Sequence, residues 1–167
     1  LDPAKGEPWA LRAPAGFAVL GSRLQLEQTC LGAATGGALC VSADWPNSGV
    51  IVHGDALPLA LVQPWLPLNE GRRTYLGGEL TLDGQLRPRG NGLQGQIKLL
   101  SPQGSIRLGE SERGQLLSYD NFNATVDLTP QAINGYLGVG FRGDGFIDAK
   151  VSTGWSPNSP LVGDLYL

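Results

Sequence analysis

Residues 76–86 have the sequence LGGELTLDGQL, in which the leucines alternate with Glu79, Thr81, Asp83 and Gln85. Successive side chains of a β-strand point to opposite faces, so this alternation places the leucines on one face and the polar residues on the other. The stretch therefore predicts a strand with one apolar face, and the same pattern continues through most of the chain.

The motif Leu-x-Gly-x-Leu-x-Leu begins at Leu76 and recurs, with Ile97 replacing one leucine, at Leu93 and then at Leu161. The chain contains 25 glycines in 167 residues, about twice the usual share of roughly 7%. Glycine inside a strand weakens it but permits tight bending of the sheet. The sequence predicts an all-β fold, an elongated and strongly curved antiparallel-rich meander resembling a taco, with a hydrophobic groove and one short helix.

Turn signals separate the expected strands, because glycine and proline are the strongest breaks in local structure. They lie at residues 46–49, 87–92 and 143–145. We expect short turns at these positions, with a strand on either side of each.

The aliphatic faces of these strands need a partner, which could be a second sheet, the opposite wall of one curled sheet, or a bound lipid or peptide. A single glycine-rich meander favours the curled sheet, and an open groove would mark a binding site. The residues expected to line this hydrophobic groove are Leu39, Val41, Val50, Val52, Leu76, Leu80, Leu82, Leu86, Leu93, Ile97, Leu99, Ile106, Leu108, Phe122, Val126, Ile133, Leu137, Val139, Phe141, Ile147, Val151, Leu161 and Leu165.

Residues 56–67 break the alternation with the sequence ALPLALVQPWLP. Proline suits the first turn of a helix, so we expect a short buried helix from Pro58 to about Trp65. So short a helix is unstable alone in water and has to pack on the apolar face of the sheet. The side chains expected to make this contact with the groove are Leu59, Leu61, Val62 and Trp65.

The two cysteines, Cys30 and Cys40, flank a Gly/Ala-rich loop between strand-like segments. A hairpin would bring the sulfurs together, and closing so small a loop stabilises the fold by roughly 2–3 kcal/mol. The alternative is a pair of free thiols in a reducing compartment. We expect a disulfide, because no histidine or cysteine set with zinc spacing accompanies the pair, and hence an oxidising compartment such as the periplasm.

The composition argues against several classes of function. A net charge of -3 with only 16% charged residues leaves no basic surface for nucleic acid. His53 is the only histidine, and it lies on the expected polar side of a strand. We therefore expect no catalytic residue, no metal site and no cofactor, and a function in binding rather than in catalysis.

The chain is expected to form a single β-taco-like unit over residues 1–167, or two sub-units meeting near residues 110–120. It begins at Leu1 and stops at Leu167 in mid-pattern, so we expect it to be part of a larger protein.

Two segments carry a family resemblance. Residues 37–45, GALCVSADW, and residues 57–67, LPLALVQPWLP, followed by the Leu-x-Gly repeats, resemble the C-terminal region of the TamB family of AsmA-like proteins. The resemblance covers about residues 24–167, and the two segments are more specific than the repeats.

The resemblance implies a β-taco with a hydrophobic interior, in a parent protein anchored in the Gram-negative inner membrane and crossing the periplasm. It implies a TamA-like outer-membrane barrel of the Omp85 type as a partner in the translocation and assembly module. The family is associated with outer-membrane biogenesis, through the assembly of β-barrels and the secretion of autotransporters, and its relatives with phospholipid transport. Phospholipid acyl chains, nascent outer-membrane β-strands, or both are the expected occupants of the groove, and a structural spacer is the third reading.

Overall fold

The computed structural model describes residues 8–34, 36–61, 74–90, 92–109, 115–143 and 145–167. These residues form one antiparallel sheet in which neighbours in sequence are almost always neighbours in space. Its strands are β1 (Trp9–Leu11), β2 (Phe17–Leu20), β3 (Arg23–Ala33), β4 (Ala38–Trp45), β5 (Gly49–Pro58), β6 (Thr74–Arg89), β7 (Gly92–Leu108), β8 (Gln115–Leu128), β9 (Ile133–Phe141), β10 (Gly145–Thr153) and β11 (Val162–Tyr166).

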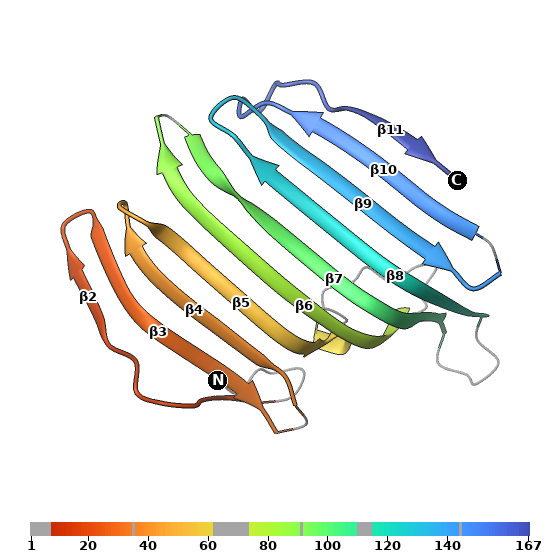
Figure 1. Ribbon diagram of the computed structural model, residues 1–167, viewed down its shortest axis with the longest axis horizontal. Helices are drawn as coiled ribbons and strands as arrows, with labels where there is room; N and C mark the ends of the chain where they lie inside the picture. The colour runs from red at the N-terminus through yellow and green to blue at the C-terminus, as the bar shows by residue number, and fades with distance from the viewer. Residues whose placement is uncertain (1–7, 35, 62–73, 91, 110–114, 144) are drawn as a thin grey trace.

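The order of strands in the sheet is β1-β3-β4-β5-β6-β7-β8-β9-β10-β11, with β2 also paired to β3. Figure 1 shows that the sheet stays open, with β2 and β11 at opposite ends of the molecule. The all-β, curved antiparallel meander predicted from the alternation is confirmed, and the sheet runs without a break from β7 to β8.

The predicted turn at residues 46–49 joins β4 to β5, whereas the one at residues 87–92 is shorter than expected because β6 extends to Arg89 and β7 begins at Gly92. Residues 102–104, with the sequence Pro-Gln-Gly, interrupt the alternation without ending a strand. Those residues lie inside the continuous strand β7, at a point where its register with β6 shifts between Gly78 and Thr81. A proline lacks the N–H that a regular ladder uses, and a bulge accommodates it.

The sheet is irregular along one line that crosses several strands. Register shifts occur in β5 between Gly54 and Leu57, between β6 and β7, and in β8 between Asp120 and Asn123. At two of them a residue other than glycine has a positive φ, 47° at Ala56 and 59° at Asn121. A bulge bends its strand and increases its twist, so bulges on adjacent strands bend the whole sheet along this line.

The best-buried side chains gather at this bend. Leu57 and Tyr119 are 7% and 5% exposed, and they are the only buried large apolar residues in the described chain; Ser101 is 1% exposed. The Ser101 hydroxyl donates to the carbonyl oxygen of Glu79 at 2.6 Å and lies 2.8 Å from the Tyr119 hydroxyl. The Tyr119 ring meets Phe122 edge-on, with 6.1 Å between ring centroids.

Outside the bend the molecule has little enclosed core. Its accessible surface is 11213 Å² for a mass of 17.6 kDa, whereas a compact monomer of that mass exposes about 7,900 Å². The excess is expected for a single layer of strands, because the described residues form one sheet with no second layer packed on it.

Of the helix predicted from Pro58 to about Trp65, the described residues contain only a 3-10 turn. Pro58 is the last residue of β5, where it pairs with Glu79 of β6, and residues 59–61 form one 3-10 turn. Pairing with a neighbouring strand outweighs the local preference of proline for a helix start. Leu59 and Leu61 are in this turn, and Val62 and Trp65 lie outside the described residues.

Candidate functional site

The register of the strands brings the predicted groove residues together on one face, here called the apolar face. Directly opposed residues of antiparallel strands share a face. One row of opposed residues consists of Val41, Val52, Gly84, Ile97, Val126, Gly135, Val151 and Gly163. The next row consists of Leu39, Gly54, Leu82, Leu99, Ala124, Leu137, Ala149 and Leu165.

The remaining predicted groove residues within strands follow the same pairing. Leu108 is paired through its backbone with Thr74 of β6 and Gln115 of β8. Leu161 is placed differently, because it precedes β11 and is 71% exposed. Residues that join the two rows on the apolar face through their partners, or by two-residue steps along a strand, are Val50, Leu76, Leu80, Leu86, Leu93, Ile106, Phe122, Ile133, Val139, Phe141 and Ile147.

Glycines keep the apolar face smooth. Gly84 stands between Val52 and Ile97, and a methyl group placed on it would lie 2.6 Å from Cγ1 of Val52. The valine therefore already fills the space above the glycine. Gly135 has the same relation to Val151, whose Cγ2 would lie 2.8 Å from such a methyl group. The branched side chains cover the neighbouring glycines, so the apolar face is even. The glycines themselves allow the strands to curve.

The 3-10 turn packs on the same face. A methyl group on Gly78, which belongs to the apolar face by its position in β6, would lie 3.5 Å from Cδ1 of Leu59. Leu59 therefore lies close to Gly78, and the contact of the whole segment with the groove stays a prediction. Over the rest of the face the described side chains are mostly half-buried rather than enclosed.

The apolar face is wider than the sequence predicted. Leu11 is opposed to Leu31, which is opposed to Leu39, and Phe17 is opposed to Leu26. The face therefore continues across β3 to the N-terminal edge, where Leu11 is 56% and Phe17 is 75% exposed. The alternation of Leu24 and Leu26 predicts a strand at β3. The sequence of residues 9–20 contains no pattern that predicts their pairing with this strand.

The opposite face is polar and carries its own hollow, which the sequence did not predict. The Nδ1 atom of His53 lies 2.6 Å from Oδ1 of Asp83, and Nε2 of Gln96 donates to Oδ1 of Asp127 at 2.5 Å. These side chains line a shallow depression of about 800 Å³. His53 and Asp83 are each 56% exposed, which agrees with the expectation that His53 lies on the polar side of a strand.

Further along the polar face, Tyr136 has a perturbed ionisation. A hydrogen bond to Asp148 raises the pKa of the Tyr136 phenol, with smaller contributions from desolvation and from the negative charge of Asp148. Within the described part of the chain, no group of three or more His, Cys, Asp or Glu side chains could hold a metal ion.

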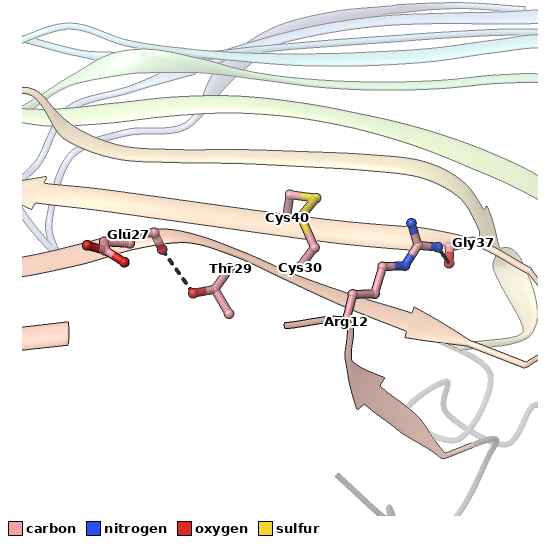
Figure 2. Close-up of a disulfide and its surroundings, with 6 residues drawn as sticks. All are labelled: Arg12, Glu27, Thr29, Cys30, Gly37 and Cys40. Atoms are coloured by element: carbon pink, nitrogen blue, oxygen red, sulfur yellow. Dashed lines mark hydrogen bonds between the residues drawn. A yellow bond between two sulfur atoms is a disulfide. The ribbon is translucent and has the colours of Figure 1, made fainter. Parts of the chain in front are cut away.

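The predicted disulfide is confirmed. Cys30 of β3 and Cys40 of β4 are directly opposed and joined, and Figure 2 shows the bond bridging the two strands. Both residues lie on the polar face, because Cys40 is directly opposed to His53. The disulfide therefore fixes the register of β3 on β4 without occupying the apolar face.

No protein-family model, curated protein or solved structure matches the chain. No helix among the described residues is long and apolar enough to cross a membrane. The arrangement of side chains is therefore the basis for a functional proposal, together with the family resemblance of the sequence.

Proposed function

We propose that this chain is a periplasmic groove module of a protein that bridges the inner and outer membranes, and that its apolar face carries phospholipid acyl chains. The observation that carries the proposal is the unbroken apolar face, which crosses the sheet from β2 to β11 and has no second layer in the described residues. Contiguous exposed apolar surface on this scale is rare in soluble monomers and marks interaction sites.

The chemistry of the face suits acyl chains. Its side chains are mostly aliphatic, with a few aromatic rings such as Phe122 and Phe141, and the charged side chains of the central strands lie on the opposite face. Each buried methylene group of a lipid would contribute about 0.8 kcal/mol, so a chain lying along a row of the sheet needs no specific polar contact. The proposal keeps the TamA-like barrel as the partner of the parent protein and outer-membrane assembly as the process served.

Two adjacent leucines of β7 provide a matched test. Leu99 is on the apolar face opposite Leu82, and Leu100 is on the polar face opposite Thr81, where it is 48% exposed. We expect Leu99→Glu to displace lipid and Leu100→Glu to leave it bound. If the bound acyl chain loses contact with Leu99 over two of its methylene groups, its binding weakens by about 1.6 kcal/mol, or roughly tenfold in affinity.

The measurement is the amount of phospholipid that remains with each purified variant in native mass spectra, together with lipid transport by the parent protein. Thermal unfolding followed by circular dichroism shows whether each variant keeps its fold, and Leu137→Glu on β9 serves as a second apolar-face variant. Equal lipid binding by the Leu99 and Leu100 variants, both folded, would sink the proposal.

A second candidate function is a scaffold for β-barrel assembly, in which a nascent strand pairs with an open edge of the sheet. The observation that favours it is β11, whose residues are all exposed and which pairs only with β10 in the described chain. An exposed edge presents unpaired backbone groups that another strand can use. Proline at β11 positions whose N–H groups face outward would impair this function and leave lipid binding intact.

A further inference from the structure

The strand β2 differs from the central strands because both of its faces are apolar. Its sequence is FAVL, and all four residues are exposed. Val19 is opposed to Leu24 and lies with Phe17 on the apolar face. Leu20, which is opposed to Arg23, extends the other face. Phe17, Val19 and Leu20 are 75%, 62% and 72% exposed, so β2 presents large apolar side chains on both sides of the sheet.

The turn that joins β2 to β3 carries these side chains to an uncovered tip. It consists of Gly21 and Ser22, and the φ of 62° at Gly21 fits a tight two-residue hairpin. A methyl group on Gly21 would meet no atom within 4 Å. A further strand paired to the edge of β2 would satisfy its backbone but leave both faces open. An apolar medium surrounding the hairpin would bury the side chains of both faces at once.

Two further hairpins close at the same side of the molecule. Leu24 near the start of β3 is opposed to Trp45 at the end of β4. Arg89 at the end of β6 is opposed to Gly92 at the start of β7. Figure 1 shows the β2–β3, β4–β5 and β6–β7 hairpins closing along one side of the sheet. This side, here called the hairpin rim, comprises the described residues 18–25, 43–51, 87–90 and 92–94.

The hairpin rim is cationic. Its charged side chains are Arg23, Arg87, Arg89 and Asp44. The arginines are exposed, and Arg23 and Arg89 form no ion pair with a carboxylate among the described residues. Both oxygens of the Asp44 carboxylate accept from Nδ2 of Asn47, at 3.1 and 3.2 Å. The rim therefore has an excess of positive charge along the side that carries the apolar tip.

Exposed apolar side chains together with arginines suit the surface of a membrane. Apolar groups enter the boundary between headgroups and acyl chains, and cationic side chains are attracted to anionic lipid. We propose that the hairpin rim docks on a bilayer that contains anionic phospholipid, with Val19 and Leu20 entering its surface and Arg23 contacting phosphate. This docking rests on the proposed function, since it would bring the apolar face to the membrane that supplies or receives its lipid.

The test is co-sedimentation of the purified chain with phosphatidylcholine vesicles that contain phosphatidylglycerol or lack it. We expect Leu20→Ser to weaken binding by about tenfold and Arg23→Gln to weaken binding to the anionic vesicles by about fivefold. Leu116→Ser and Arg107→Gln are the matched controls and should bind as the unaltered chain does. Leu116 and Arg107 form a second exposed and opposed pair, at the start of β8 and the end of β7, away from the hairpin rim.

Equal losses at the two pairs, or binding that is indifferent to phosphatidylglycerol, would overturn the proposal. It would also fail if Leu20→Ser dissolved a dimer in light scattering without altering vesicle binding, because β2 would then cover a second copy of the chain. Native mass spectra separate the docking from the proposed function. A chain that keeps phospholipid but does not bind vesicles refutes the docking alone, and one that docks without retaining phospholipid refutes the lipid-carrying face alone.

Discussion

Ser101 and Tyr119 are the residues that fix the bend of the sheet. Ser101 is among the most enclosed side chains described, and its hydroxyl meets both the Glu79 carbonyl and the Tyr119 hydroxyl. A methyl group on Gly104 would clash with the Tyr119 ring, so the ring lies directly over that glycine. An aromatic ring covering a glycine on a neighbouring strand compensates for the missing side chain.

We expect Tyr119→Phe to lower the free energy of unfolding by about 1 kcal/mol, because Ser101 loses one hydrogen-bond partner in a site closed to water. Chemical denaturation measures this change. Tyr166→Phe removes a hydroxyl from a side chain that is 58% exposed and should leave stability unaltered. An equal effect of the two substitutions would mean that the bend does not depend on this pair.

Neither residue could be found from the sequence. Phe122, Ala124, Val126 and Leu128 alternate on even numbers, so Tyr119, on an odd number, belongs by that pattern to the polar face. At Asn121, which has a positive φ, the bulge adds one residue to the strand. Odd-numbered residues before it therefore lie on the apolar face, and Tyr119 is one of them. Side-chain alternation predicts faces only as far as the next bulge.

At the scale of elements, the glycine of the Leu-x-Gly motif marks a close approach between strands. Gly78 has a φ of 120°, and a methyl group on it would lie 2.7 Å from the carbonyl oxygen of Gln103. Side chains do not fit there, because the obstacle is backbone and because L-residues rarely adopt this φ. Of the three copies of the motif, the one at Leu76 therefore coincides with the line of bulges.

We expect Gly78→Ala to lower the free energy of unfolding by about 2–3 kcal/mol, since it combines a disfavoured φ with a backbone clash. The adjacent Gly77 is the control, because a methyl group there meets only the movable Oγ of Ser105, at 2.8 Å. Denaturation of both variants gives the comparison. Equal losses at the two positions would show that the bulge does not require glycine.

The strands were predictable from period-2 alternation, and the disulfide from the spacing of two cysteines. The ends of the strands were not predictable, because Pro58 carries a local signal for the start of a helix. Pairing with Glu79 of β6 keeps Pro58 inside β5. Backbone hydrogen bonds to a partner distant in sequence outweigh local propensity, and the sequence of one segment does not reveal them.

At the scale of the whole molecule, one sheet with opposed apolar and polar faces follows from the alternation, and most of the predicted groove residues share a face as expected. The sequence left open whether a second sheet covers the apolar face. The order of strands answers this for the described residues, since they form one layer with two free edges.

The most direct test is site-specific photocrosslinking along β6 in the parent protein in cells. A photoreactive amino acid is placed in turn at Leu80, Thr81, Leu82 and Asp83, and the adducts are identified by mass spectrometry. We expect phospholipid adducts at Leu80 and Leu82 and none at Thr81 and Asp83, because the faces alternate. Adducts independent of the face, or only polypeptide adducts at Leu80 and Leu82, would contradict it.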